Sequence, residues 1–288
     1  MTTKIVCNWI ILIKIMKNIL KNKAAFIGMI FIALVIFTAV LAPVIAPYHP
    51  SAQNLMQRLN PPSASHILGT DDLGRDVFSR MIYGARVSVS VGFFAVFIAV
   101  IIGCSIGMLS GYFGGITDSI LMRFTDIMLC FPTFFLILIV IAFFEPNIYN
   151  VMIVIGLTSW TGLARIVRAE VLSVREREFV LASKMLAVSK PRLFFVHILP
   201  NVISPIIVYA AIGIGGAILT ESGLSFLGLG VQPPMSSWGQ ILMQGKDYIY
   251  IAWWLSLFPG IAILLTVLSF NMIGEFLRDM FDPKEVKN

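Results

Sequence analysis

The chain has 288 residues, of which 58% are hydrophobic and 12% are charged, and its mean hydropathy is +0.90. An average soluble domain has roughly 25% charged residues, so this composition excludes an ordinary soluble protein and indicates a chain that lives in a lipid bilayer. The formal charge of +6 calls for no nucleic acid partner, because basic residues beside membrane spans contact the headgroups of membrane lipid.

Residues 1–23 mix an apolar patch with lysines and resemble a secretory signal at first sight. A small-residue cleavage site is missing, Lys14 and Lys17 interrupt the apolar patch, and an apolar span follows at once. The pattern therefore favours an amphipathic helix lying in the membrane interface.

Six stretches without Asp, Glu, Lys or Arg are each near or above the roughly 18 to 20 residues that cross about 30 Å of hydrocarbon as a helix. They are residues 24–46, 87–117, 127–144, 146–164, 193–220 and 248–274. Strands of a membrane barrel would alternate apolar and polar residues, whereas these runs are apolar on all sides. We therefore predict an all-α membrane protein with six transmembrane helices.

A seventh uncharged stretch, residues 222–245, contains Pro233 and Pro234 together with several serines and glycines. A regular helix could not satisfy the backbone hydrogen bonds of this stretch in lipid. We predict an outside loop, with partial re-entry into the membrane as an alternative.

With six spans, both termini share one side of the membrane. Placing the termini in the cytoplasm leaves five of the 21 Lys and Arg residues outside and the other 16 at the inner face. The five are Arg58, Arg75, Arg80, Arg86 and Lys246. This asymmetry satisfies the positive-inside rule, so we predict that both termini are cytoplasmic.

The segment between the first two spans, residues 49–86, is the largest predicted outside loop. Its charged and imidazole side chains include His49, His66, Asp71, Asp72, Arg75 and Asp76. The aspartates and histidines suggest a hard-metal or nickel site, but DDLGRD lacks the ligand spacing of an EF-hand and includes an arginine. Ion pairing and helix capping are the better interpretation, and we predict no metal site.

The chain shows no chemistry of turnover. It has no GxxxxGK[ST] loop for nucleotide phosphates, since Gly245 and Lys246 are followed by Asp247, and no histidine lies near a Ser or Cys in a nucleophile motif. The three cysteines are too scattered for a disulfide framework or a CxxC metal pattern. We predict that the chain is not an enzyme and has no catalytic or cofactor-binding residues.

Charged residues at the ends of the spans are candidate functional groups. Arg165 and Arg168 lie three residues apart on one helix face, where pairing with acidic neighbours or snorkelling is favoured over contact with a substrate. Glu145 and Glu221 lie at outer ends of spans and are candidates to meet a cationic substrate.

The segment after the fourth span is the main polar segment on the predicted cytoplasmic side. VLSVREREFVLASKMLA, residues 171–187, favours a helix, and Ser189 or Lys190 is placed to cap a second helix that has Pro191 at an early position. Two short helices joined by a sharp bend are expected. The residues leave two interpretations open, a solvated amphipathic connector and an element that binds a partner.

At this point the sequence resembles a known family. The segments that carry the resemblance are LGTDDLGRDVFSR, ARIVRAEVLSVREREFVLAS, HILPN, LSFLGLGVQPP and FNMIGEFLRDMFDP, which span nearly the whole chain in the family's order. They are similar to ATP-binding-cassette (ABC) importer permeases, and in particular to the second permease of the dipeptide, oligopeptide and nickel group. The resemblance implies the type I ABC importer permease fold and a cytoplasmic coupling motif that enters a groove on an ATPase subunit.

The coupling residues implied by this resemblance are Arg177, Glu178, Phe179, Ala182, Ser183, Ala187, Leu199 and Pro200. Four positions depart from the family motif: Leu181 replaces Glu, Ser183 replaces Ala, Ala187 replaces Gly, and His197 replaces Ile. Since Ala adopts a positive φ less freely than Gly does, we expect the turn to form later, around residues 188–190.

The resemblance also implies partners for both sides of the membrane. A homologous permease would form a heterodimeric pore with this chain, two ATPase subunits would hold the ATP and Mg, and an extracytoplasmic substrate-binding protein would deliver the substrate. The charges suited to orient that binding protein are Asp71, Asp72, Arg75, Asp76 and Arg80. The alternative is that these charges tie the loop to its own bundle. Gly103, Gly107 and Gly111 recur every four residues, a spacing that lets helices approach closely and suits a bundle that packs against a second permease.

Three regions are expected along the chain. Residues 1–85 hold the interfacial helix, the first span and the outside loop; residues 86–275 form the type-1 permease domain with coupling helices at about 172–200; residues 276–288 are a cytoplasmic tail. The expected function is import of di- or oligopeptides across the bacterial cytoplasmic (inner) membrane by a multi-pass pore subunit. Nickel or metal-chelate import by the same architecture is one alternative, and a non-transporting membrane scaffold or receptor is the other.

Overall fold

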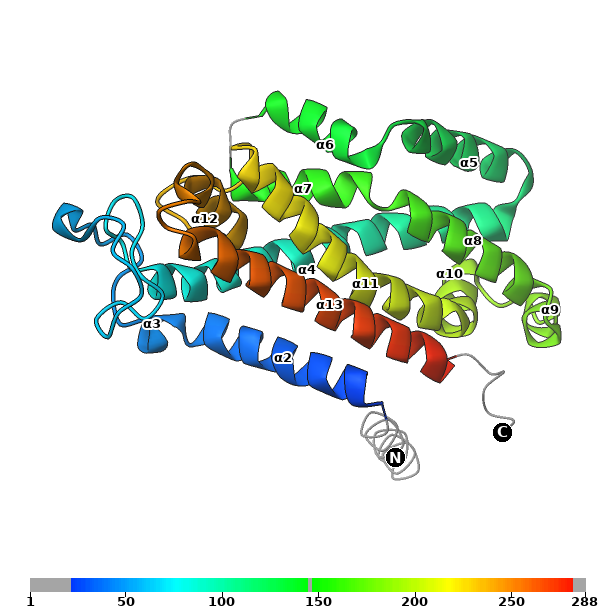
Figure 1. Cartoon of the computed structure of the whole chain (residues 1–288). Helices are drawn as coiled ribbons and strands as arrows, with labels where there is room; N and C mark the ends of the chain where they lie inside the picture. Colours follow the sequence, from blue (N-terminus) through cyan, green and yellow to red (C-terminus); the bar gives the residue numbers. More distant parts are fainter. Residues whose placement is uncertain (1–21, 145–146, 282–288) are drawn as a thin grey trace.

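The computed structural model describes residues 22–144 and 147–281. Within these ranges the regular secondary structure is helical, and a single bridge joins Thr70 to Asp76. The expected interfacial helix and the end of the expected cytoplasmic tail lie outside the described residues. Figure 1 shows long helices side by side in one elongated bundle.

The helices that build the bundle are mostly long and apolar. In chain order they are α2 (Lys23–Val40), α3 (Ala42–Ile45), α4 (Val77–Phe113), α5 (Gly115–Cys130), α6 (Thr133–Ala142), α7 (Ile148–Thr158), α8 (Thr161–Arg175), α9 (Glu178–Met185), α10 (Lys190–Arg192), the π-helix η2 (Leu193–Ile198), α11 (Leu199–Phe226), α12 (Trp238–Gly245) and α13 (Trp254–Phe281). The 3-10 helices η1 (Leu55–Gln57) and η3 (Lys246–Tyr248) lie in the connections. The expected region boundary at residue 86 falls inside α4, so the first two regions share one bundle.

Five helical stretches in the described ranges are long and apolar enough to cross a membrane. They are α2, α4, α7 with α8, α10 through α11, and α13. The pair α5 and α6, bent by 85°, provides a sixth when it counts as one broken span. The prediction of an all-helical membrane protein is therefore confirmed, and six spans are reached when the bent pair counts as one.

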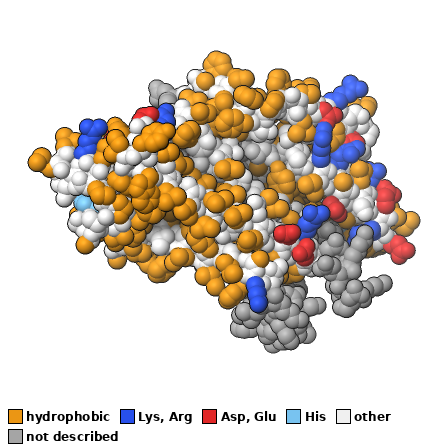
Figure 2. Space-filling view, in the orientation of Figure 1, with side chains coloured by type: hydrophobic (Ala, Val, Ile, Leu, Met, Phe, Trp, Pro, Cys, Tyr) orange, Lys and Arg blue, Asp and Glu red, His pale blue; other side chains and the backbone are white. Residues whose placement is uncertain are grey.

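The surface fits a bilayer. Figure 2 shows hydrophobic side chains over most of the visible face, while charged side chains gather mainly at the end of the bundle that carries α9. The first described helix, α2, begins at this end and α13 finishes there (Figure 1). The two described ends of the chain therefore lie on the same side of the bundle.

The helix α4 begins at Val77, ten residues before the expected stretch 87–117. The carboxylate of Asp76 caps it by accepting hydrogen bonds of 2.8 Å from the backbone N–H and from the hydroxyl of Ser79. The helix ends where Gly114 takes a φ of 66°, a conformation that glycine adopts at little cost. The expected stretch was chosen for its lack of charged residues, so it missed the start of α4. The first turns of this helix contain charge, which the fold buries.

The bend between α5 and α6 has a local cause. Pro132 has no backbone N–H and disfavours a helical conformation at the preceding residue, and Phe131 is extended, with φ −95° and ψ 130°. Residues 118–126, expected to connect two spans, are helical within α5. The broken span therefore begins at Gly115, twelve residues before the expected stretch 127–144.

The stretch 222–245 is a loop only in its middle part, residues 227–237, where Pro233 and Pro234 are exposed. α11 continues to Phe226, and α12 packs against α4, α11 and α13 with Trp238 and Ile241 buried. The hydroxyl of Ser237 caps α12 by accepting the backbone N–H of Gln240 at 3.2 Å. The expectation of a loop was therefore wrong for the two ends of the stretch, which are helical, whereas the residues between α11 and α12 do form a loop.

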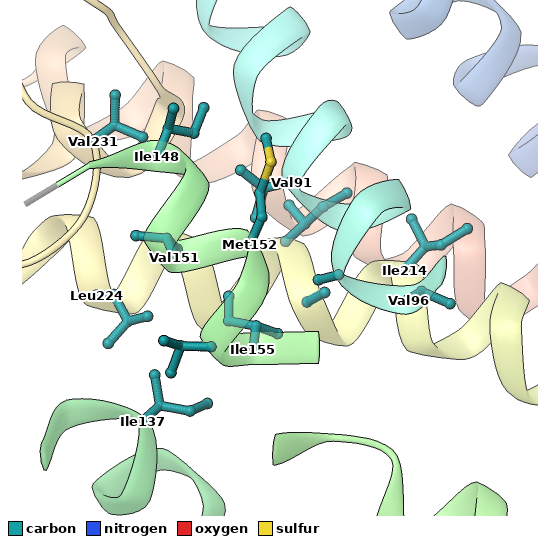
Figure 3. Close-up of a cluster of buried hydrophobic side chains, with 14 of the residues drawn as sticks. Val91, Val96, Ile137, Ile148, Val151, Met152, Ile155, Ile214, Leu224 and Val231 are labelled. Carbon is teal, nitrogen blue, oxygen red and sulfur yellow. The ribbon is translucent and has the colours of Figure 1, made fainter. Parts of the chain in front are cut away.

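The largest hydrophobic cluster of the bundle lies where α4, α7 and α11 meet. Figure 3 shows Val91 of α4, Val151 and Ile155 of α7, and Ile214 and Leu224 of α11 converging on it. This cluster fixes the outer half of α11 against α4 and α7.

The glycines at positions 103, 107 and 111 pack against α8 of the same chain. A Cβ added at Gly107 would lie 2.6 Å from the carbonyl oxygen of Ala164 and 2.7 Å from the Cβ of Val167. The close helix approach expected from this spacing therefore occurs within the chain, between α4 and α8.

Gly107→Ala is expected to destabilise the protein by about 1–3 kcal/mol, because the added methyl overpacks the contact between α4 and α8. Gly216→Ala is the matched control, since a Cβ at that helical glycine meets nothing within 4 Å. Thermal unfolding of the purified protein in detergent checks the pair. Equal melting temperatures for the two variants would show that α4 and α8 are not in close contact.

Candidate functional site

The coupling segment, residues 175–200, lies at the charged end of the bundle. It consists of the short helix α9, a tight turn, and α10 with η2 leading into α11 (Figure 1). Two short helical elements joined by a bend are what the sequence predicted.

One face of α9 is fixed to the bundle. Val180 and Ser183 are buried, and Val180 packs in a hydrophobic cluster with Val174, Leu193 and Ile198. The Ser183 hydroxyl donates a 2.7 Å hydrogen bond to the carbonyl of Phe179. Ser183 therefore points into the protein. Its burial corrects the expectation that this side chain faces a partner.

The opposite face of α9 is exposed and largely apolar. Met185 is 89% exposed and Leu186 is 79% exposed, and Phe179, Leu181 and Ala182 are exposed beside them. Apolar side chains at the charged end of a membrane protein indicate a surface that another protein covers. Of the other expected coupling residues, Arg177, Glu178, Ala187 and Pro200 are exposed, and Leu199 is half-buried.

The turn after α9 is a Schellman motif. The backbone N–H of Val188 donates to the carbonyl of Ser183 at 3.2 Å, and the N–H of Ala187 donates to the carbonyl of Lys184 at 3.0 Å. Ala187 itself has a φ of 52°. The expectation of a later turn, at residues 188–190, was wrong, because the two hydrogen bonds require the left-handed residue at position 187.

Ala187→Gly is expected to stabilise this turn by about 1 kcal/mol, because glycine removes the crowding of the Cβ in the left-handed region. Hydrogen exchange at the amides of Ala187 and Val188 checks it, and slower exchange in the variant is the expected result. Ala182→Gly is the control, since it places glycine inside α9 and should speed exchange there. Unchanged exchange in the Ala187 variant would contradict the assigned turn.

The expected docking charges of the outer loop form a buried cluster. The carboxylate of Asp71 accepts a 2.7 Å hydrogen bond from Nε of Arg75 and a second from Arg80, whose side chain is 1% exposed. Arg80 also donates to Gln244 at 2.7 Å, to Ser236 at 3.1 Å and to Gln240 at 3.1 Å. These contacts tie the outer loop to α12, which is the alternative that the sequence left open.

Burial limits which of these charges can meet a partner. Asp71, Arg75, Asp76 and Arg80 are buried, and Asp76 accepts from the His66 ring at 2.8 Å besides capping α4. The side chain of Asp72 is 27% exposed and lies 3.7 Å from Arg75. Of the five expected docking charges, Asp72 is therefore the one with an accessible side chain. Within the described residues no group of three metal-ligating side chains occurs.

Glu221 lies in a separate polar cluster between α4, α11 and α12. It is 0% exposed, and its carboxylate accepts hydrogen bonds from Ser225 at 2.7 Å and from Ser88 at 3.2 Å. Its burial corrects the expectation that it could meet a cationic substrate. The other candidate, Glu145, lies outside the described residues.

The arginines at the inner end of α8 are paired, as the sequence indicated. Arg168 donates two hydrogen bonds, of 2.5 and 2.6 Å, to the carboxylate of Asp118 on α5. Arg165 contacts Asp126 at 2.5 Å. These pairs join α5 to α8 near the coupling segment.

Sequence reasoning missed the polar side chains of α12. Gln240 and Gln244 accept hydrogen bonds from Arg80, and Gln244 also accepts one from Arg75 at 3.2 Å. In the sequence these two glutamines are four residues apart in an uncharged stretch. That spacing places both on one face of a helix, and it is the feature that could have identified them.

Together, these helices describe a multi-pass membrane protein with an exposed helical segment at its charged end (Figure 2). A family profile described as "Binding-protein-dependent transport system inner membrane component" matches residues 101–287, and a second, "N-terminal TM domain of oligopeptide transport permease C", matches residues 12–62. The chain belongs to the first of these families, the permeases of ABC importers, in which separate subunits carry the ATPase activity.

Curated relatives are similar over most of this chain. The "Dipeptide transport system permease protein DppC" of Alkalihalophilus pseudofirmus is 46% identical over 93% of this chain and 88% of its own length. The "Oligopeptide transport system permease protein OppC" of Bacillus subtilis is 40% identical over 91% of this chain and 86% of its own. Among solved structures, an inward-facing MetNI methionine ABC transporter matches with a TM-score of 0.58 and 16% identity, over 71% of this chain and 98% of that chain. That likeness supports the type I importer permease fold.

Proposed function

We propose that this chain is one of two homologous permease subunits through which an ATP-driven importer of the bacterial cytoplasmic membrane takes up di- or oligopeptides. The observation that carries the proposal is the similarity to permeases named for dipeptide and oligopeptide transport along about nine-tenths of the chain. Nickel import by the same architecture is the less favoured alternative, since those relatives are named for peptides.

The exposed face of α9 is the proposed contact for an ATPase subunit. Phe179, Ala182 and Met185 lie on exposed positions of α9, while Val180 fixes the helix to the bundle. A contact of this kind can transmit motion, because its far side is held by a packed core. Arg177, Glu178, Leu199 and Pro200 belong to the same proposed coupling role.

The outer loop is the proposed contact for an extracytoplasmic binding protein. Asp72 supplies an accessible charge, and the buried cluster around Asp71 holds the loop in shape against α12. Asp72→Lys should then weaken binding-protein affinity at low salt more than at high salt.

Reconstitution tests the proposed function. The chain would be assembled in proteoliposomes with the neighbouring permease, both ATPases and the binding protein, and ATP-dependent uptake of a labelled dipeptide would be measured. Competition by unlabelled short peptides, without competition by nickel, supports a peptide importer. ATP-dependent uptake of labelled nickel without uptake of the dipeptide supports the metal alternative, and absence of ATP-dependent uptake of either substrate by an assembled complex supports a scaffold or receptor.

A further inference from the structure

An apolar groove runs along α4 toward the coupling segment. It encloses about 690 Å³, lined on one side by α4 from Val100 to Phe113 and on the other by residues of α10, η2 and α11. Apart from Ser105 and Lys190, the lining side chains are apolar. Volumes of roughly 300–1,000 Å³ are typical of sites for small organic molecules.

The length of this groove matches one leaflet of a bilayer. From Val100 to Phe113, α4 rises by about 20 Å at roughly 1.5 Å per residue. One leaflet contributes about 15 Å of a hydrocarbon core that is about 30 Å thick. An acyl chain lying in the groove would therefore remain at the depth it has in the membrane.

The end of the groove at the coupling segment is basic and built on aromatic rings. Nζ of Lys190 lies 5.5 Å from the centre of the Phe113 ring, and Nζ of Lys184 lies 5.3 Å from the centre of the Tyr112 ring. The Tyr112 ring packs on Phe194 with centroids 4.6 Å apart. In the part of the chain that the structure describes, neither lysine forms an ion pair with a carboxylate.

Lys190 in the lining of the groove and Lys184, which lies over the neighbouring Tyr112 ring, complement one kind of molecule. A phospholipid supplies an acyl chain for the apolar walls and a phosphate for the ammonium groups, and basic pockets between membrane helices recognise anionic headgroups in this way. We propose that the groove binds an anionic phospholipid, with one acyl chain along α4 and the headgroup phosphate against Lys190 and Lys184.

This lipid would also brace the coupling segment. Lys184 lies in the last turn of α9 and Lys190 begins α10, so the two lysines flank the turn at Ala187. A phosphate held between them would neutralise both charges and link the two sides of the turn. Anionic lipid should therefore slow hydrogen exchange in residues 184–190.

The test measures lipid retention directly and needs no transport. The assembled complex would be placed in nanodiscs of phosphatidylcholine with or without phosphatidylglycerol, and bound lipid would be measured by native mass spectrometry. Wild type should retain one phosphatidylglycerol, and Lys190→Gln should bind it about fivefold more weakly, as expected for one basic side chain near a charged surface. Arg123→Gln is the matched control, an exposed basic residue on α5, away from the groove lining.

A second measurement reports on the groove itself. Cys104 lines the groove, and in a Cys7→Ser, Cys130→Ser background its thiol is the one target on this chain for a lipid-soluble maleimide, so labelling is read from the band of this subunit. Phosphatidylglycerol should slow its labelling, and Ser105→Trp, which fills the groove, should abolish lipid retention while the complex still assembles.

Three results would overturn the proposal. They are equal retention of the two lipids, an equal loss in the Arg123 control, and a Cys104 thiol that is unreactive in every lipid while Ser105→Trp blocks assembly with the second permease. The last would show that a helix of the other permease fills the groove. None of these results bears on whether the complex imports peptides.

Discussion

Asp71→Asn is expected to destabilise the protein by about 3–5 kcal/mol, because it leaves two buried arginines without the carboxylate that they share. The Asp71 carboxylate also accepts backbone hydrogen bonds of 2.9 Å from Leu73 and Arg75, which shape the outer loop. The substitution replaces one carboxylate oxygen by an NH2 group. This group is a hydrogen-bond donor, and it would face the N–H donors that the carboxylate accepts from. The loop should separate from α12 as a result.

Asp72→Asn is the matched control, because it makes the same chemical change at the neighbouring position. The Asp72 side chain is partly exposed and its contact with Arg75 is long, so a change of less than about 1 kcal/mol is expected. Thermal unfolding of the purified protein, followed by tryptophan fluorescence, compares the two. Trp254 is a suitable reporter, since its indole N–H donates to the carbonyl of Thr70 at 3.1 Å in the same loop. An Asp71 variant that melts with the wild type would show that the cluster does not hold the loop.

Ala182→Trp is expected to abolish ATP-driven uptake while the protein remains folded in the membrane. Ala182 is exposed on α9, so a large side chain there adds bulk to the proposed ATPase contact without entering the core. We expect the rate of uptake to fall more than a hundredfold. A factor of this size corresponds to the loss of about 3 kcal/mol or more of binding free energy at the interface. Co-purification of the ATPase subunits measures their binding, and uptake by proteoliposomes measures transport.

Two further variants separate coupling from folding. Ser183→Trp changes the neighbouring residue, but its side chain is buried, so the expected result is loss of folded protein rather than loss of coupling alone. Ala52→Trp places the same bulk on the outer loop, where Ala52 is exposed, and should leave ATPase binding unchanged. Normal ATPase binding and normal uptake by the Ala182 variant would refute the coupling role of α9.

Composition and motifs predicted most of this architecture. Apolar runs predicted the spans because a membrane helix must be apolar over its length, and Pro191 predicted the start of the second helix of the coupling segment. The break at Pro132, inside the expected span 127–144, was not predicted. The ends of the helices were less predictable. Arg80 and Asp76 looked like loop charges, yet Arg80 belongs to the first turn of α4 and Asp76 caps that helix. The burial of Arg80 could not be predicted, because it donates to Gln240 on α12, 160 residues further along the chain.

The candidate site was predicted in part. The helix-turn-helix form of the coupling segment followed from residues 171–191, whereas the inward direction of Ser183 depends on the rotation of α9 against the bundle. The position of the turn was predicted wrongly because a preference for glycine was given more weight than hydrogen bonding. The Schellman bonds of Ala187 and Val188 outweigh a steric cost of about 1–2 kcal/mol for a left-handed alanine.

The polypeptide path from α10 to α11 connects the coupling segment with the polar cluster around Glu221. This path is π-helical from Leu193 to Ile198, and Pro200 and Pro205 follow in α11. The regular ladder of helical hydrogen bonds is therefore interrupted in the first part of the path. Beyond Pro205 the helix runs without a break to Phe226. The path as far as Pro205 is thus compliant and the remainder is stiff. A displacement of α9 would therefore bend this path before Pro205, while the outer half of α11, which carries Glu221, stays packed against α4 and α7.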